Sequence, residues 1–294
     1  ARKLVFQGEK KTAFMTSKRC VRIVFTENSS FEPVIANMVL ECRASVNILL
    51  ADTQDVGGIA RGQMILQLPE ETQTAEKMIQ YLIVEGTFAT IYMTLLSTLM
   101  AYVIGLPVGV ALVVTGREGL KPNAAVNKVL DVIVNITRSI PFLILLILVI
   151  PLTRAIVGKS YGPSATVVPL TLAAAPFVAR LVESSLLEVD RGVIEAAQSM
   201  GAGIPTIVTK VMLLEARSSL LSNLAIALGT ILGYSAMAGA VGGGGLGDIA
   251  IRYGYNRYEF DIMIVTVILL VLLVQIMQVI CMKLARKLDR RSTG

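Results

Sequence analysis

The residue types that most often build nucleophilic and metal centres are scarce in this chain. It contains no histidine and three cysteines, Cys20, Cys42 and Cys281. Without histidine, a Ser-His-Asp or Cys-His nucleophile system and a His-ligated metal site are both excluded. The cysteines form no CxxC pair, and the third lies in a long apolar stretch, so their spacing predicts neither a zinc site nor a disulfide framework. We therefore expect no catalytic residue and no metal site in this sequence.

A glycine-rich run at residues 242–247 matches the G-x-G-x-x-G spacing of dinucleotide-binding loops. In those loops the glycines join a strand to a helix and let a pyrophosphate approach the backbone. Here the run follows an apolar stretch, and no G-K-[ST] sequence accompanies it. The sequence therefore favours a tightly packed loop between two membrane helices over a nucleotide site.

The composition is that of a membrane protein. Of the 294 residues, 54% are hydrophobic and 16% are charged, whereas soluble domains average about 45–50% apolar and about 25% charged residues. A bilayer core of about 30 Å needs roughly 20 apolar residues of helix. Five stretches are long enough, so we predict an all-α membrane bundle of five transmembrane helices. They lie at residues 86–115, 126–157, 163–187, 218–241 and 260–282.

The basic residues indicate the orientation of these spans. They gather at residues 117–128, at residues 180–217 and directly after the last span. Because cytoplasmic flanks are rich in Lys and Arg, we expect a multi-pass protein of the cell membrane with a cytoplasmic C-terminus. Five spans then place residues 1–80 on the external side. These flanks also account for the net charge of +6, so we expect no nucleic-acid partner.

Arg138, in the run NITRSIPF, lies in or near the second predicted span. Inside the bilayer it would mark a substrate path or pair two helices. At the cytoplasmic edge it would simply extend towards water. The strongly apolar run begins only after Ile140, which favours the edge.

Residues 21–83 have the pattern of a small α/β domain, preceded by a linker at residues 1–20. Three runs rich in β-branched residues, VRIVF, VNILLAD and RGQMILQL, predict strands. Residues 34–42 repeat apolar side chains at helical spacing, and a second helix is predicted from Pro69 into the first span. The resulting order, βαββα, is one strand short of a ferredoxin-like unit.

One moderately polar segment interrupts the apolar region: residues 191–216, RGVIEAAQSMGAGIPTIVTKVMLLEA. Ala196 and Ala197 allow another backbone to approach closely, and Glu195 can pair with a basic partner. Gly201 permits a sharp turn. These features suit a short helix that docks on another protein, and they also suit an ordinary amphipathic loop helix.

This segment resembles the EAA signature of ABC-importer permeases, except at Leu214, where that family usually has proline. Four more runs look like the methionine-uptake permeases over about residues 84–291: VIGLPVGVALVVT, NITRSIPFLILL, PLTLAAAPFVARLVESSLLEV and GYSAMAGAVGGGGLGDIAIRYGY. The resemblance implies a bacterial homodimer of five-span subunits that binds no cofactor itself. Its implied partners are ATP-hydrolysing subunits and an extracytoplasmic methionine-binding lipoprotein. Residues 195–201 would be its coupling helix, docked on the ATPase.

Residues 20–83 resemble the NIL domain, named for an Asn-Ile-Leu sequence like residues 47–49. That domain normally follows the ATPase of the same transporter and binds methionine to inhibit uptake when the cytoplasm is replete. The resemblance therefore implies a cytoplasmic side for residues 20–83, which an uncounted re-entrant segment would give, whereas five spans place them outside. The resemblance assigns this regulatory methionine to Asn47 and Met64, whose amide and thioether suit the polar groups and the sulfur of methionine. As structural residues they would instead cap a strand end and fill the core.

Import of L-methionine, D-methionine or both is thus the predicted function. A permease for another amino acid and a membrane-anchored amino-acid sensor are the alternatives, although a sensor would need no EAA segment. A secondary transporter would use carboxylates inside the membrane for ion coupling. The predicted spans contain almost none away from their ends, which disfavours that class.

Overall fold

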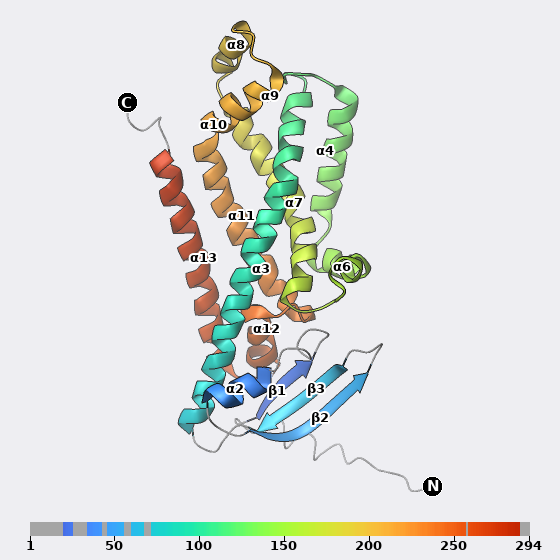
Figure 1. Ribbon diagram of the computed structural model, residues 1–294, viewed down its shortest axis with the longest axis vertical. Helices are drawn as coiled ribbons and strands as arrows, with labels where there is room; N and C mark the ends of the chain where they lie inside the picture. Colours follow the sequence, from blue (N-terminus) through green and yellow to red (C-terminus); the bar gives the residue numbers. More distant parts are fainter. Residues whose placement is uncertain are drawn as a thin grey trace. The chain divides into compact units, whose positions relative to one another are not determined.

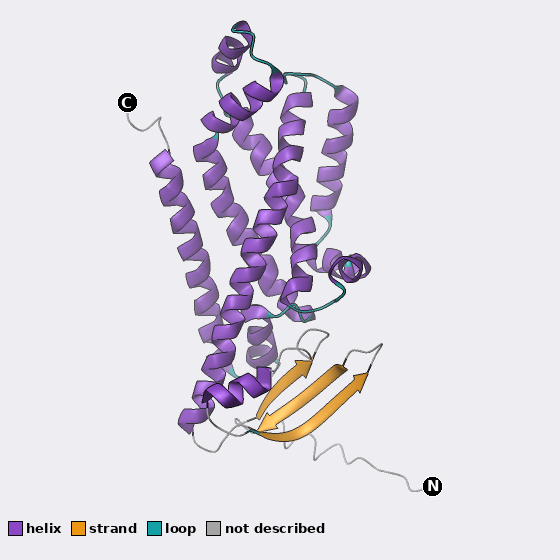
Figure 2. Ribbon diagram, in the orientation of Figure 1, coloured by secondary structure: helices purple, strands orange, loops and turns teal. Residues whose placement is uncertain are grey.

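The computed structural model divides the chain into two compact units, Ala1–Gly86 and Thr87–Gly294 (Figures 1 and 2). It describes residues 20–25, 34–42, 46–55, 60–67, 72–256 and 258–288. The predicted linker at residues 1–20 therefore lies outside the described residues, apart from Cys20.

The N-terminal unit contains an antiparallel sheet, drawn in orange in Figure 2. Its described elements are β1 (Cys20–Phe25), α2 (Val34–Cys42), β2 (Asn47–Asp55), β3 (Ala60–Gln67) and the start of α3 (Thr72–Thr115). β3 is the central strand, and its Met64 lies opposite Ile23 of β1 and Ala51 of β2. Met38 of α2 and Leu66 of β3 are fully buried. This order, βαββα, is the one that the β-branched runs and the helical spacing predict.

The C-terminal unit is a bundle of apolar helices. Among the described residues, four helices are long and apolar enough to cross a membrane, and the number becomes five if one bent pair forms a single span. The four spans are Ile79–Thr115 in α3, Pro163–Leu187 (α7), Arg217–Val241 (α11, Arg217–Ala238, with the turn η2, Gly239–Val241) and Phe260–Lys287 in α13 (Phe260–Leu288). The predicted membrane bundle is thereby confirmed, with four to five spans.

The stretch expected as one span at residues 126–157 is divided into three helices. They are α4 (Ala124–Ser139), α5 (Phe142–Leu148) and α6 (Ile150–Val157), and α4 meets α5 at 101°. Pro141 explains the bend, because proline lacks the N–H that continues a helix and excludes the helical conformation from the preceding residue. Ile140 is accordingly extended, with φ −77° and ψ 123°.

Arg138 lies in the last turn of α4, not at the start of that helix. A rise of 1.5 Å per residue places it roughly 20 Å along the axis from Ala124. The basic loop at residues 117–121 precedes the other end of α4, so Arg138 and that loop cannot both lie at the cytoplasmic edge.

Helices α3 and α7 pack with their backbones in close approach. A Cβ atom on Gly105 would lie 2.7 Å from the carbonyl oxygen of Ala175, and one on Gly109 would lie 2.6 Å from that of Ala179. Residues four apart share a helix face, and small residues there let membrane helices approach closely. The GLPVG run of α3 therefore fixes this helix against α7.

The glycine-rich run at residues 242–247 follows η2 and includes the start of α12 (Gly245–Ile249), and no strand precedes it in this part of the described chain. A Cβ atom on Gly245 would lie 2.6 Å from Oγ1 of Thr90. That same hydroxyl oxygen accepts a hydrogen bond from the Leu246 N–H at 2.8 Å. The run is a packed loop, as the sequence favours, and it lacks the strand–helix context of a dinucleotide site.

Candidate functional site

The polar segment at residues 191–216 forms a short helix and a return into the bundle. In order these are α8 (Arg191–Ser199), α9 (Ile204–Thr206), the π-helical stretch η1 (Ile207–Met212) and α10 (Leu213–Glu215). Figure 1 shows α8 at one end of the bundle, beyond the ends of α3 and α7. Leu214, where the EAA pattern has proline, lies in α10 and is exposed.

The first turn of α8 is closed by Asp190. The Asp190 Oδ1 accepts a hydrogen bond from the Gly192 N–H at 2.6 Å. Aspartate is a favoured N-cap because its side chain satisfies an N–H that has no partner within the helix. The start of α8 is therefore determined locally, by the residue that precedes it.

The last turn of α8 is closed at Gly201. Its φ of 77° lies in the left-handed region that favours glycine. The Gly201 N–H donates to the Gln198 carbonyl at 2.9 Å, and the Ala202 N–H donates to the Ala197 carbonyl at 3.1 Å. This pair of bonds is the Schellman pattern. Gly201 thus ends α8 and turns the chain back towards the bundle.

The four residues assigned to docking occupy two different environments. Glu195, Ala196 and Gly201 are exposed, and a Cβ atom on Gly201 would meet nothing within 4 Å. Ala197 is only 6% exposed and belongs to the apolar core of its own chain. Its small side chain therefore lets α8 approach η1, while the other three remain accessible to a partner.

An apolar cluster joins α8 to three membrane helices. It contains buried residues of α3, α7 and α11 together with Ala197 and residues of η1. Its main members are Ala101, Val178, Val182, Leu186, Ala197, Ile207, Val208, Met212, Ala227 and Ile231. Because protein interiors are close-packed, Ala197 packs α8 against the same apolar core as α3, α7 and α11.

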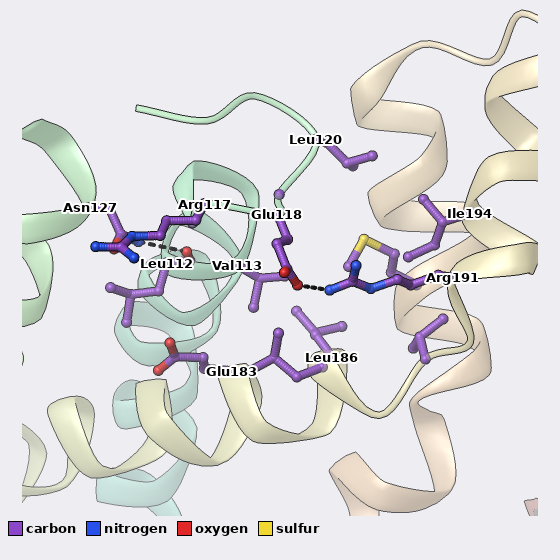
Figure 3. Close-up of a pocket in the computed structure, with 15 residues that line it drawn as sticks. Leu112, Val113, Arg117, Glu118, Leu120, Asn127, Glu183, Leu186, Arg191 and Ile194 are labelled. Carbon is purple, nitrogen blue, oxygen red and sulfur yellow. Dashed lines mark hydrogen bonds and ion pairs between the residues drawn. The ribbon is translucent and has the colours of Figure 1, made fainter. Parts of the chain in front are cut away.

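A cavity of about 360 Å³ lies beside the first turn of α8 (Figure 3). Its walls are the ends of α3 and α7, the loop at residues 116–120, Asn127 of α4, and residues of α8 and η1. Glu118 of the loop forms an ion pair with Arg191, the first residue of α8. Their side chains are 69% and 68% exposed, so the pair contributes little stability. It is a weak link between the loop after α3 and α8.

Sequence reasoning missed a charged cluster between α4 and α7. Arg180 of α7 forms ion pairs with Asp131 of α4 and, at 2.7 Å, with Glu183 one turn further along α7. It also donates a hydrogen bond to Asn135 Oδ1 at 2.9 Å. The sequence does contain a signal for this cluster, because Asp131 and Arg180 are charged residues within predicted membrane spans. Charged residues at such positions are rare and usually functional.

The two residues assigned to regulatory methionine lie in the sheet of the N-terminal unit. Asn47 begins β2 opposite Gln67, whereas Met64 of β3 lies opposite Ala51. The two are thus three positions apart in the register, roughly 10 Å along the strands. They occupy neighbouring strands without forming a cross-strand pair, and Asn47 is exposed.

The bundle matches a known family of transporters. The sequence pattern described as "Binding-protein-dependent transport system inner membrane component" matches residues 102–293. The chain belongs to this family. Within the inner membrane component, the matched residues include α8, its two caps and the cavity beside it. A second pattern, the NIL domain, matches residues 19–87, which contain the described strands of the N-terminal unit.

Relatives of this inner membrane component include methionine permeases. The probable D-methionine transport system permease protein MetI of Vibrio cholerae is 51% identical over 210 residues, which are 71% of this chain and 93% of that protein. The methionine import system permease protein MetP of Bacillus subtilis is 44% identical over 180 residues, 61% of this chain and 81% of that protein. The resemblance to methionine-uptake permeases drawn from the sequence is confirmed.

Solved structures agree with this assignment. A structure of the MetNI methionine ABC transporter in inward facing conformations has 48% sequence identity and a TM-score of 0.71, over 72% of this chain and 98% of that chain. An amino acid ABC transporter crystallised with histidines has 22% identity and a TM-score of 0.55, over 74% of this chain and 97% of that chain. The second comparison shows the shared fold alone.

Proposed function

We propose that this chain is the transmembrane subunit of an ATP-driven importer of methionine, taking up the L-form, the D-form or both. The observation that carries the proposal is α8: a polar helix, capped at both ends and exposing Glu195 and Ala196, at one end of an apolar bundle. Relatives with the same bundle are named as methionine permeases. The chain itself performs no catalysis, and a separate subunit hydrolyses ATP.

The working assembly contains two copies of this chain, two ATPase subunits and an extracytoplasmic methionine-binding lipoprotein. The bent pair α4–α5 counts as the second of five spans, so the C-terminus is cytoplasmic and α8 faces the ATPase. Similarity to the MetNI methionine ABC transporter supports an ATPase partner. The orientation is supported by the basic residues that follow α13.

The coupling mechanism follows from the two environments of the α8 residues. Glu195 and Ala196 contact the ATPase, and the turn at Gly201 holds α8 in the docked orientation. Ala197 seats α8 on η1. When ATP binding brings the two ATPases together, α8 moves with them. The shared apolar cluster then shifts α3, α7 and α11 and changes the side from which the pore is open.

Transport by purified complex in proteoliposomes tests the proposal. With the partner ATPase and the binding lipoprotein present, we expect ATP-dependent uptake of labelled methionine that exceeds uptake of labelled leucine or glutamine. Gly201→Val should abolish uptake while the protein still folds and inserts. Preferential uptake of another amino acid would refute the assignment of methionine as the substrate. Normal transport by Gly201→Val would refute the coupling role of α8.

We also propose that the N-terminal unit is a ferredoxin-like NIL domain that binds methionine through Asn47 and Met64. Support comes from the NIL match over residues 19–87, which include both residues. Calorimetric titration of the full chain in detergent should show methionine binding that Asn47→Leu weakens. Equal affinity of the two proteins would contradict the assignment.

Five spans place this NIL domain on the external side of the membrane. There it would respond to methionine outside the cell. Cys42, a free and partly buried cysteine of α2, offers the test. A membrane-impermeant maleimide should label it in intact cells, with brief denaturation as the control for burial. Labelling confined to inverted vesicles would refute this orientation.

A further inference from the structure

We propose that Arg180 is a positioning residue that transmits the movement of α8 to α4, the first half of the bent span. This inference rests on the proposed function, because it concerns how coupling reaches the pore. Its starting point is the location of Arg180 within α7, whose end at Leu187 is joined to the start of α8 at Arg191 by a short connection. Arg180 is seven residues before that end, about 10 Å along the axis.

The guanidinium of Arg180 joins two helices through three acceptors. Its Nη2 contacts Asp131 and Asn135, which lie one turn apart on α4, while its Nη1 contacts Glu183 on α7. Asn135 Nδ2 also donates to the second carboxylate oxygen of Asp131 at 3.2 Å. Only a planar guanidinium presents several donors in such a fixed fork. The contact therefore depends on the orientation of the Arg180 guanidinium relative to α4 as well as on its charge.

Arg180 and Glu183 are largely withheld from water. Their side chains are each 21% exposed, and Asp131 is 44% exposed. An apolar contact of the same size would hold two membrane helices together without the cost of desolvating charge. Such a contact already exists close by, since Leu112, Val134 and Ala179 form a buried cluster. Adhesion of α4 to the bundle thus does not require the ionic cluster.

The cluster lies between the coupling end and the bent span. Glu183 lines the cavity beside α8 (Figure 3). On the other side, α4 leads through the 101° bend into α5. The Phe142 ring of α5 stacks on Tyr234 of α11, with ring centroids 4.7 Å apart. A movement of α8 can therefore pass along α7, through Arg180 to α4, and from α5 to α11.

Two conservative variants separate positioning from adhesion. Arg180→Lys keeps the charge and loses the fork, and Asp131→Asn keeps the shape and loses the charge. The matched controls are Arg154→Lys and Asp261→Asn, the same changes at exposed positions of α6 and α13. The amount of assembled complex, its ATPase rate and the methionine imported per ATP hydrolysed are measured in proteoliposomes.

We expect both cluster variants to assemble and to hydrolyse ATP, with methionine imported per ATP reduced about tenfold. The controls should match the parent. Asp131→Asn combined with Asn135→Asp, which moves the carboxylate one turn along α4, should restore much of the ratio. An unchanged ratio overturns the inference, as does a loss of assembly that accounts for the whole loss of uptake. If the parent chain itself imports no methionine, the proposed function fails instead.

Discussion

Gly109 offers a direct test of how α3 packs on α7. In Gly109→Ala the new methyl group would lie 2.6 Å from the Ala179 carbonyl oxygen and 2.8 Å from Cβ of Val182. The obstructing atoms belong to a backbone and to a β-branched side chain, so no flexible side chain can rotate away. The helices must separate, or the methyl group must be accommodated under strain.

The size of the effect follows from two opposing terms. Ordinary contact begins at 3.4 Å, so α3 must move away from Ala179 by about 0.8 Å. Overpacking of this kind costs about 1–3 kcal/mol. Alanine also favours a helix over glycine by up to about 1 kcal/mol. The matched control is Gly233→Ala on α11, where a Cβ atom meets nothing within 4 Å. This control variant has the same gain in helix propensity but creates no steric clash.

Thermal unfolding of the purified chain, followed by fluorescence-detected gel filtration, measures both variants. We expect Gly233→Ala to unfold at or slightly above the temperature of the parent. Gly109→Ala should unfold at least about 2 °C below Gly233→Ala, as a difference of about 1 kcal/mol requires for a domain of this size. Gly105→Ala should behave like Gly109→Ala, because its Cβ would lie 2.7 Å from a backbone oxygen. Equal midpoints for Gly109→Ala and Gly233→Ala would refute the close approach of α3 and α7.

Three further changes test local geometry. Gly201→Ala should lower methionine uptake, because a left-handed non-glycine residue costs about 1–2 kcal/mol, whereas Gly201→Asn should retain more activity; identical rates would show that the turn is unimportant. Asp190→Ala removes the N-cap of α8 at a cost of about 0.5–2 kcal/mol, and hydrogen exchange in residues 191–199 should accelerate; unchanged exchange would contradict the cap. Gly245→Ala would bring a methyl group within 2.6 Å of Thr90 Oγ1 and place alanine at a φ of 78°, so it should lower the unfolding temperature; an unchanged midpoint would contradict the packing of this loop.

Features that depend on neighbours in the sequence were predictable. The length of the apolar stretches determines which helices can cross a bilayer. The ends of α8 follow from Asp190 and Gly201, whose hydrogen bonds reach only two to five residues along the chain. The location of the strands along the N-terminal unit follows from the β-branched runs. In each case the determining residues lie within the element itself or directly beside it in the sequence.

Other features required the packed bundle. Pro141 predicts a break, but the 101° angle depends on where α5 packs against α7 and α11. The EAA segment does not show that Ala197 points into its own core, because that depends on the return of η1 beneath α8. The pair of Arg180 and Asp131 joins residues 49 positions apart. Sequence alone therefore determined the membrane class, the family and the caps of α8. Tertiary packing decided which charges meet and which side of α8 stays exposed, since distant side chains become neighbours only when the helices assemble.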